Sequence, residues 1–196
     1  MSGIAAVILA GGKAERLGGV NKALIEIGGS TLLQRARDAV AGCEPVLLAV
    51  GASGFTADGM TAIPDIVSGY AGPLAGVVAA VDGLRDVDAD WLLSVAVDTP
   101  FFPADFVTRA LPLGATADVV IGCFGSQDYP TNALWRLVAI RDLPQALRDG
   151  TAPHSLKRLA ASLRSVRLDY AGTSADDPFL NANTPEDLAF LRSRPR

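Results

Sequence analysis

The sequence predicts an α/β fold of three layers, in which helices cover both faces of a mostly parallel central sheet. Three short and almost entirely apolar runs indicate strands buried on both faces: Ile4–Leu9, Pro45–Val50 and Trp91–Val97. Segments with apolar residues at helical spacing lie between these runs, and strands that alternate with helices usually form a parallel sheet. Because the chain has 196 residues and no internal repeat or linker, we expect one domain over residues 1–196.

In the first half of the chain, two helix starts can be placed from local chemistry. Ser30 or Thr31 suits the N-cap of a helix, because the apolar positions that follow recur at the helical period. Pro73 suits the first position of another helix, where its missing N–H would have no partner anyway. The other segments expected here are a loop over Gly11–Asn21, a short strand over Ala23–Ile27, a strand over Met60–Ile63 and a loop over Asp65–Gly72.

The second half continues the alternation, and its strands too should end at the edge where ligands bind. The strand Trp91–Val97 stops at Thr99-Pro100, and right-handed crossovers bring the loops that follow parallel strands to one edge of the sheet. The further elements expected are a helix over Pro103–Leu111, strands over Asp118–Phe124, Thr131–Trp135 and Ser165–Tyr170, helical segments over Ala139–Leu147 and Ser155–Leu163, and a last helix from Pro185.

Composition and charge exclude several classes of function. The net charge is −4 and no run of Lys or Arg forms a basic patch, so nucleic acid and anionic membranes are poor partners. Cys43 and Cys123 do not form a CxxC pair and His154 is the single histidine, so a zinc site is not expected. Without a signal peptide or an apolar run of about 18–20 residues, we expect a cytoplasmic protein with buried thiols.

The first loop, GGKAERLGG, allows several interpretations. A dinucleotide-binding fingerprint needs G-x-G-x-x-G running into a helix, and a P-loop needs Ser or Thr after Gly12-Lys13, where this chain has Ala14. The loop could also be a flexible surface turn. In the remaining interpretation its backbone N–H groups cradle a triphosphate, while Arg16 and Lys22 neutralise the charge from either end.

The pattern L-A-G-G-x-x-x-R-L-G-G-x-N-K-A-L resembles the signature of sugar-phosphate and cofactor nucleotidyltransferases, and more narrowly the MobA family of molybdenum cofactor guanylyltransferases. Four further blocks resemble that family in the same order: GPLAG, DTPFFP, YPTNAL and FLNANTPEDL. The departures are Asn21 where Asp is usual, Leu17 for Met, Val97 for Cys, and no Asn near Val50. These departures bear on nucleotide affinity more than on the reaction class.

The resemblance implies a Rossmann-like nucleotidyltransferase fold that transfers GMP from GTP to the terminal phosphate of Mo-molybdopterin, with Mg²⁺ as cofactor and pyrophosphate as product. Residues about 1–100 would bind the nucleotide and about 101–196 the molybdopterin. It also implies transient contacts with proteins that deliver molybdopterin and that mature molybdoenzymes. Three alternatives stay open: a cytidylyltransferase or a nucleotidyltransferase for another phosphorylated acceptor, a non-catalytic nucleotide- or cofactor-binding protein, and a dinucleotide-dependent oxidoreductase, which the glycine spacing disfavours.

The expected chemistry needs charge neutralisation more than proton transfer. The acceptor is a phosphate monoester with a second pKa of about 6, so it is largely ionised at pH 7 and needs no general base. The difficulty is the attack of one anion on another, which cations and alignment must relieve. Asp98, which follows a buried strand, could hold a hydrated Mg²⁺ that bridges phosphates, although a helix N-cap is the alternative role for this carboxylate.

The candidate site residues fall into three groups. The catalytic candidates are Arg16, Lys22 and Asp98, with Asp98 also the metal ligand. The acceptor-binding candidates are Asn181 and Asn183, although Thr184-Pro185-Glu186-Asp187 is a helix start in its own right. Asp65 could accept hydrogen bonds from guanine or could close a turn, and Gly72 and Gly76 could serve helix–sheet packing instead of the nucleotide. The nucleotide-binding candidates are Leu9, Ala10, Gly11, Gly12, Lys22, Asp65, Gly72, Gly76 and Asp98.

Overall fold

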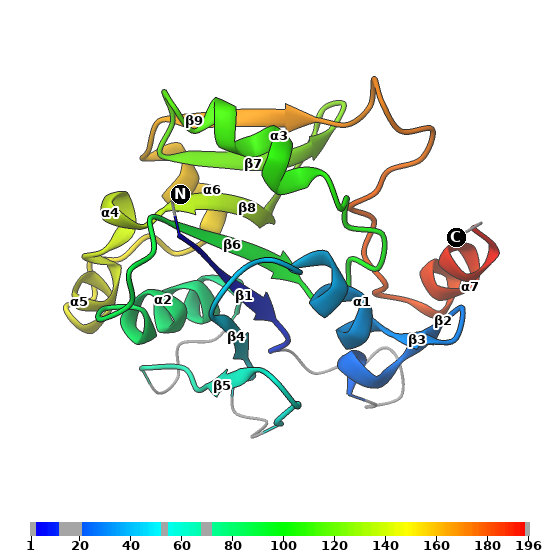
Figure 1. Cartoon of the computed structure of the whole chain (residues 1–196), viewed down its shortest axis with the longest axis horizontal. Helices are drawn as coiled ribbons and strands as arrows, with labels where there is room; N and C mark the ends of the chain where they lie inside the picture. Colours follow the sequence, from blue (N-terminus) through cyan, green and yellow to red (C-terminus); the bar gives the residue numbers. More distant parts are fainter. Residues whose placement is uncertain (1–2, 12–20, 52–54, 68–71, 195–196) are drawn as a thin grey trace.

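A computed structural model gives the architecture, and it describes residues 3–11, 21–51, 55–67 and 72–194. Seven strands form one sheet in the order β5-β4-β1-β6-β8-β7-β9, and a separate two-stranded sheet pairs β2 with β3 (Figure 1). The expected α/β fold is therefore confirmed. The strands of the large sheet are β1 (Ile4–Leu9), β4 (Val46–Ala49), β5 (Thr61–Ile63), β6 (Trp91–Ala96), β7 (Val119–Phe124), β8 (Gln127–Arg136) and β9 (Ser165–Asp169).

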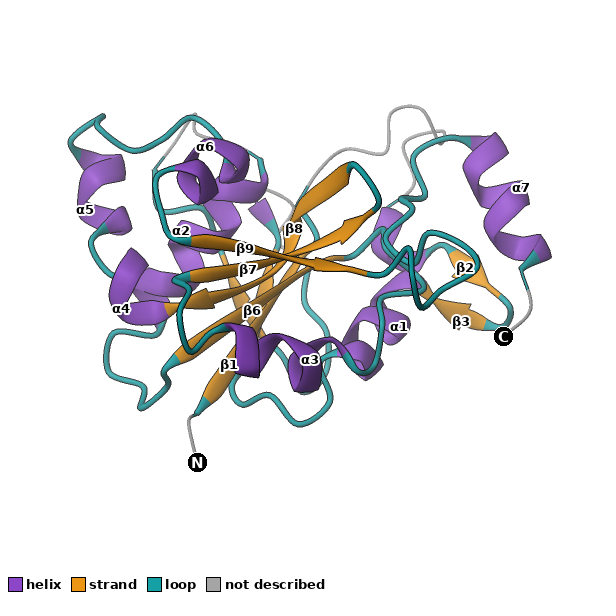
Figure 2. Cartoon of the chain, turned by 90° about the horizontal axis from the view of Figure 1, so that it is seen from above, coloured by secondary structure: helices purple, strands orange, loops and turns teal. Residues whose placement is uncertain are grey.

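Helices cover the sheet on both sides, which makes three layers (Figure 2). One apolar core holds buried side chains from α1, α3 and α7, and the other holds those from α2, α5 and α6. Alternate residues of β1 enter the two cores: Ala6 and Ile8 the first, Ala5 and Val7 the second. The helices are α1 (Leu32–Ala39), α2 (Pro73–Gly83), α3 (Phe106–Leu113), α4 (Leu137–Ile140), α5 (Leu143–Arg148), α6 (Leu156–Ala161) and α7 (Pro185–Ser193).

One strand runs against the others. β8 pairs antiparallel with both β6 and β7, whereas the pairs β1–β4, β1–β6, β4–β5 and β7–β9 are parallel. β7 and β8 form a hairpin whose last pair joins Phe124 to Gln127, and Gly125 takes a φ of 57° in the two-residue turn. The strand expected over Thr131–Trp135 is therefore longer than the sequence pattern indicated, because the hairpin adds residues at its start.

Two expected elements differ from the structure near the first loop and the middle of the chain. Instead of a strand over Ala23–Ile27, a 3₁₀ turn (η2, Lys22–Leu24) precedes the two-residue strand β2 (Glu26–Ile27), because the Asn21 side chain accepts from Ala23 N and caps the turn. β2 pairs with β3 (Ser30–Thr31). The helical segment over Ala139–Leu147 is divided into α4 and α5. Pro144 in the first turn of α5 has no N–H for a continuous helix, which favours the break before it.

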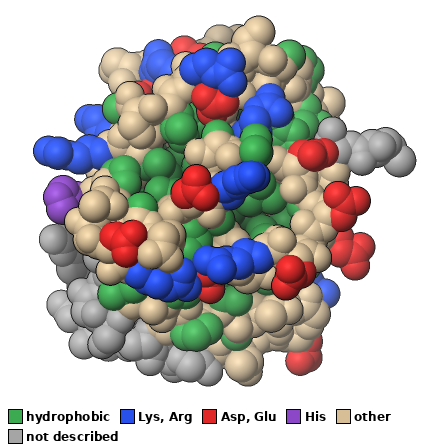
Figure 3. Space-filling view, turned by 90° about the vertical axis from the view of Figure 1, so that its left-hand side faces the viewer, with side chains coloured by type: hydrophobic (Ala, Val, Ile, Leu, Met, Phe, Trp, Pro, Cys, Tyr) green, Lys and Arg blue, Asp and Glu red, His purple; other side chains and the backbone are tan. Residues whose placement is uncertain are grey.

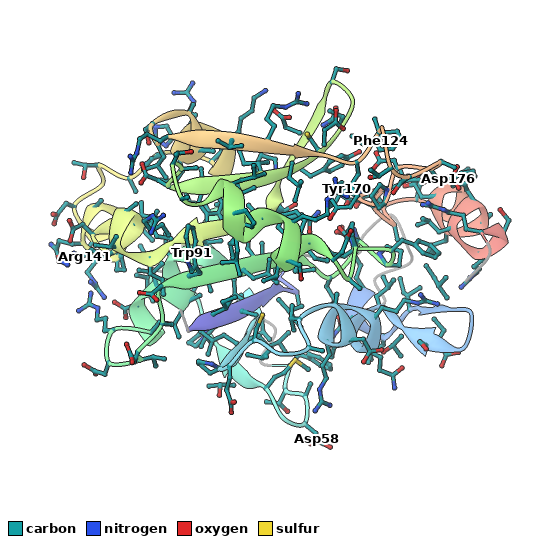
Figure 4. All side chains as sticks on the ribbon, turned by 45° about the horizontal axis from the view of Figure 1, so that its top comes forward. Asp58, Trp91, Phe124, Arg141, Tyr170 and Asp176 are labelled. Atoms are coloured by element: carbon teal, nitrogen blue, oxygen red, sulfur yellow. The ribbon has the colours of Figure 1, made fainter. Side chains whose placement is uncertain are left out.

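The parallel strands β1, β4 and β6 direct their carboxyl ends toward one edge of the sheet. In Figure 1 the arrowheads of β1 and β6 point to the side where α7 and the β2–β3 pair lie. Trp91, at the start of β6, lies toward the opposite end of the molecule from Tyr170, which follows β9 (Figure 4). Among the described residues, no helix has the length and apolar character needed to cross a membrane.

Candidate active site at the carboxyl edge of the sheet

Three polar side chains from distant parts of the chain meet beyond the end of β6. Lys22 Nζ lies 3.0 Å from Asp98 Oδ2 and 2.5 Å from Asn183 Oδ1. The side chains of Lys22 and Asp98 are each only 18% exposed, so this ion pair is partly shielded from water. The structure therefore brings together Lys22, Asp98 and Asn183, three of the candidate site residues, and we call them the Lys22–Asp98–Asn183 cluster.

Backbone contacts hold Asp98 at this place. Val97 N still donates to Leu9 O of β1 at 3.1 Å, and Thr99 N then turns back to donate to Ala96 O at 3.1 Å. The carbonyl of Asp98 accepts from Ala182 N at 2.9 Å. The Asp98 backbone is thus fixed between β1 and the segment that carries Asn181 and Asn183, so its carboxylate is directed to the edge where Lys22 lies.

Asn183 is positioned by the start of α7. Thr184 is the N-cap of this helix and accepts from Asp187 N, while the Asp187 carboxylate accepts from the backbone N–H groups of Thr184 and Asn183 at 2.8 and 3.0 Å. This reciprocal capping box confirms that the segment is a helix start in its own right. The same capping fixes the backbone of Asn183, so the local structural role and the contact with Lys22 are compatible.

A second group of residues lies where β1, β4 and β5 end. Ala10 N donates to Ala49 O at 2.9 Å, and a Cβ added to Gly11 would lie 3.5 Å from Gly51 N. Gly51 has a φ of 57°, and a Cβ there would lie 3.6 Å from Asp65 Oδ2. Burial raises the pKa of the Asp65 carboxyl above its usual value. Gly11, Gly51 and Asp65 therefore lie close together at the edge of the sheet. Leu9 and Ala10, at the end of β1, lie next to them.

Gly51 was not expected from the sequence as a site residue. It follows β4 in the stretch LLAVGAS, where the resemblance indicated only that a usual asparagine is missing. A glycine directly after an apolar strand that ends at the ligand edge is the signal that could have indicated it. Its positive φ favours a glycine here, because other residues rarely adopt this backbone conformation.

The two glycines of GPLAG have different roles. Gly72 is the N-cap of α2 with a φ of 108°, it is exposed, and no atom lies within 4 Å of a Cβ added to it. Gly76 is buried one turn into α2, and an added Cβ would come within 2.8 Å of Leu9 Cδ2 and 2.9 Å of Ala49 Cβ. Helix–sheet packing therefore accounts for the glycine at position 76, and its expected contact with the nucleotide stays a prediction.

Some candidates fall outside the described residues. Gly12 and Arg16 lie there, so their expected roles stay predictions. His154 is exposed, as Figure 3 also shows for the single histidine, and this agrees with a surface position. The face in Figure 3 carries interspersed positive and negative side chains without a continuous basic patch. Cys43 and Cys123 are free thiols, and burial raises the pKa of Cys43 to about 11.

A buried hydrogen-bond chain behind Asp98 was also not expected from the sequence. Asn132 of β8 and Thr99 are fully buried polar residues, and Asn132 Nδ2 lies 3.2 Å from Thr99 Oγ1. Thr99 Oγ1 lies 3.2 Å from Asn181 Oδ1. An asparagine directly before the apolar run Ala133–Trp135 was the available signal, because an amide buried with such a run must find partners.

A divalent metal fits the site if a bound substrate supplies some of its oxygen ligands. Among the residues that the structure describes, no group of three or more His, Cys, Asp or Glu side chains could hold an ion alone. Mg²⁺ commonly keeps several waters and binds through one or two carboxylates together with substrate phosphates. The single carboxylate of Asp98, half-buried at the edge of the sheet, suits that mode of binding.

Comparisons with known proteins agree with this architecture. The profile of the family described as MobA-like NTP transferase domain matches residues 6–166. A protein of Rhodopseudomonas palustris named molybdenum cofactor guanylyltransferase is 39% identical over 193 residues, which cover 94% of this chain and 90% of that protein. Together with the fold and the placement of Lys22 and Asp98, these matches identify a nucleotidyltransferase.

Solved structures show the same fold. Molybdopterin-guanine dinucleotide biosynthesis protein A from Archaeoglobus fulgidus aligns with a TM-score of 0.71 and 20% identity over 95% of this chain and 96% of that one. A Mycobacterium tuberculosis protein solved as a complex with manganese aligns with a TM-score of 0.65 and 17% identity over 98% and 99% of the two chains. The chain belongs to the family of MobA-like NTP transferase domains, as its sequence motifs indicated.

Proposed function

We propose that this protein transfers GMP from GTP to the terminal phosphate of Mo-molybdopterin, which forms the guanine dinucleotide cofactor and releases pyrophosphate. The names of its relatives give the reaction, since the Rhodopseudomonas protein is a molybdenum cofactor guanylyltransferase. The observation in this chain that carries the proposal is the contact of Lys22 with both Asp98 and Asn183. It joins the nucleotide half of the chain to the segment expected to bind the acceptor.

Each member of the cluster has a role in this transfer. The acceptor phosphate is ionised near neutral pH and attacks the α-phosphorus, while the bond from that phosphorus to the β-phosphate bridging oxygen breaks. The Lys22 ammonium supplies positive charge to the phosphates and to the leaving pyrophosphate. On GTP binding, Lys22 exchanges its contact with Asp98 for phosphate oxygens, and the carboxylate becomes free for a cation. No side chain has to remove a proton from the nucleophile.

Mg²⁺ is the metal that we propose for Asp98. When it is bound, it would neutralise phosphate charge between the nucleotide and the carboxylate, in the manner usual for phosphoryl transfer. The Mycobacterium tuberculosis protein of the same fold was solved as a complex with manganese, which supports the use of a divalent ion. Asp98 orients the phosphates from its fixed place beyond β6, and Arg16 would add charge from the first loop.

The edge formed by Gly11, Gly51 and Asp65 is proposed to receive the nucleoside and the start of the triphosphate. The close approach of Gly11 to Gly51 exposes backbone rather than side chains, which suits a phosphate or ribose lying against it. The N1–H and exocyclic amine of guanine are donors that the Asp65 carboxylate can accept, whereas adenine has no such pair. Asn181 and Asn183 would hold the acceptor phosphate on the other side of Asp98.

Location and protein partners complete the proposal. The free thiols of Cys43 and Cys123 suit a cytoplasmic site of action. Because molybdopterin and the finished dinucleotide are labile cofactors, transient contacts with the proteins that deliver molybdopterin and mature molybdoenzymes would protect them in transfer.

Pyrophosphate release tests the proposal. GTP, CTP and ATP are each supplied with Mg²⁺, with and without Mo-molybdopterin. Release with GTP that depends on the acceptor is the expected result. Acceptor-dependent release with CTP instead would make the protein a cytidylyltransferase, and no release with any nucleotide would contradict the proposed activity.

A further inference from the structure

Asn132 lies at an irregular point in the sheet. The β7–β8 pairing passes from Ile121↔Ala133 directly to Gly122↔Tyr129, so residues 130–132 of β8 have no partner on β7. On the other side of β8, the pairing with β6 ends at Ser94↔Ala133. Asn132 is therefore a buried polar residue just past the regular ladder, at the end of β6 that leads to Asp98.

The Asn132 amide replaces the missing ladder contact. Its Oδ1 accepts from Ala96 N at 3.0 Å, so the backbone N–H of the last residue of β6 has a hydrogen-bond partner. Its Nδ2 donates to Thr99 Oγ1 at 3.2 Å. One side chain thus contacts both ends of the short turn Ala96–Thr99 in which Asp98 lies. Because the Asn132 side chain is fully buried, it acts on a ligand only through these neighbours.

The direction of the hydrogen bonds is set by the number of protons available. Asn132 uses its oxygen for Ala96 N and so presents N–H to Thr99, whose hydroxyl oxygen accepts it. The Thr99 hydroxyl then uses its single proton to donate to Asn181 Oδ1 at 3.2 Å. With its oxygen held inward, the half-buried Asn181 amide leaves its Nδ2 protons for a ligand. An N–H group is the amide end that binds a phosphate.

We propose that Asn132 is a positioning residue which, through the Thr99 hydroxyl, holds the Asn181 amide with its Nδ2 donor toward the acceptor phosphate. This assignment rests on the proposed function for the identity of the acceptor. A side chain of β8 thereby determines which end of the Asn181 amide, in the segment before α7, faces the substrate.

Two substitutions test the direction of this chain. Asn132→Asp keeps an oxygen for Ala96 N, but an ionised carboxylate cannot donate to Thr99. The Thr99 hydroxyl then donates to Asp and no longer to Asn181, so the Asn181 amide turns its oxygen toward the phosphate. Thr99→Val removes the hydroxyl and keeps the side-chain shape. In both variants we expect the KM for the acceptor to rise about tenfold while the KM for GTP changes little.

The controls separate positioning from stability. Thr99→Ser restores a hydroxyl and should recover most of the acceptor affinity lost in Thr99→Val. Ser94→Ala removes another buried contact between β6 and β8, since Ser94 Oγ accepts from Trp135 Nε1 at 2.9 Å and lies outside the Asn132–Thr99–Asn181 chain. This control should lower the unfolding temperature without a rise in the acceptor KM. An equal rise in both KM values for Asn132→Asp would overturn the proposal.

A double-mutant cycle identifies the residue through which Asn132 acts. If Asn132 works through Asn181, Asn132→Asp should cause no further rise in the acceptor KM when Asn181 is already alanine. The same tenfold loss in that background would mean that the effect reaches the acceptor by another route, which contradicts the proposal.

A binding measurement tests the orientation without turnover. In ¹⁵N-labelled protein the Asn181 side-chain amide signal, identified by its loss in Asn181→Ala, should shift when inorganic phosphate is added. The shift should be lost in Asn132→Asp and kept in Thr99→Ser, and a wild-type signal that does not respond would overturn the inference. If this signal responds while wild-type protein releases no pyrophosphate, the proposed function fails and the positioning role stands.

Discussion

The proposed nucleotide side and the proposed acceptor side of the site are built in different ways. At the ends of β1, β4 and β5, the chain brings backbone atoms of Gly11 and Gly51 close together, with Asp65 beside them. Beyond β6, side chains from β8 and the approach to α7 form a hydrogen-bonded chain. The first surface depends on the absence of side chains and the second on their exact partners, so substitutions should affect the two sides differently.

The Lys22–Asp98–Asn183 cluster lies between these two sides, and breaking it should have the largest effect. Asp98→Ala should leave the fold intact and lower turnover at least about a thousandfold. The variant lacks the carboxylate proposed to hold Mg²⁺, so the metal would no longer neutralise the charge of the phosphates. Steady-state pyrophosphate release measures this loss. Asp82→Ala is the matched control, because Asp82 also forms ion pairs, with Arg85 and Arg148, but on α2. Full activity of Asp98→Ala at ordinary Mg²⁺ would remove the metal assignment.

Lys22 should come next in size. Lys22→Ala removes the ammonium that contacts both Asp98 and Asn183, and we expect kcat/KM for GTP to fall about a hundredfold. Lys157→Ala, which removes an exposed lysine from α6, should leave the rate unchanged. Unchanged GTP affinity together with unchanged turnover in Lys22→Ala would exclude this residue from the site.

Gly76 tests packing under the nucleotide side rather than the chemistry. Gly76→Ala brings a methyl group against Leu9 and Ala49, so the free energy of unfolding should fall by about 1–3 kcal/mol. Chemical denaturation measures it. Gly83→Ala on the same helix has only Leu47 Cδ1 nearby, at 4.0 Å, and should be neutral or stabilising by about 0.5–1 kcal/mol. Equal stability of the two variants would contradict the packing role.

Substitution of Gly11 should have the smallest effect of the four, and it should change the KM for GTP without changing the KM for the acceptor. A methyl group at Gly11 makes only ordinary contact with Gly51, so the unfolding temperature of Gly11→Ala should stay near that of wild type. The KM for GTP should rise about tenfold, since the methyl group separates the phosphates from the backbone. The KM for the acceptor should not change. Gly172→Ala, with no atom within 4 Å, is the control, and a change in the acceptor KM alone would reverse the assignment.

The strand ends could be predicted from the sequence because local patterns determine them. Apolar runs such as Ile4–Leu9 and Trp91–Val97 gave the buried parallel strands, and the crossover rule then placed Asp98 near Lys22. Their contact at 3.0 Å agrees with that prediction. The start of α7 was also predictable, since Thr184 and Asp187 form a capping box within four residues.

The acceptor side could not be predicted in the same way. The direction of β8 depends on the hairpin after Gly125, and the role of Asn132 depends on contacts with residues 33 and 36 positions away in the chain. No local period encodes such contacts, because they arise only when β6, β7 and β8 pack together. The mistaken strand over Ala23–Ile27 has a different cause: the side chain of Asn21 caps a tight turn and outweighs the β propensity of the residues that follow.

A single-turnover reaction with labelled GTP tests the central claim most directly. Enzyme in excess over GTP is mixed with Mg²⁺ and Mo-molybdopterin, in one reaction with label on the α-phosphate and in another with label on the γ-phosphate. We predict that the α-label enters the pterin dinucleotide while the γ-label appears in an equal amount of pyrophosphate. Label that stays in GTP, or that appears in GDP and free phosphate, would contradict a transfer of GMP across the Lys22–Asp98–Asn183 cluster.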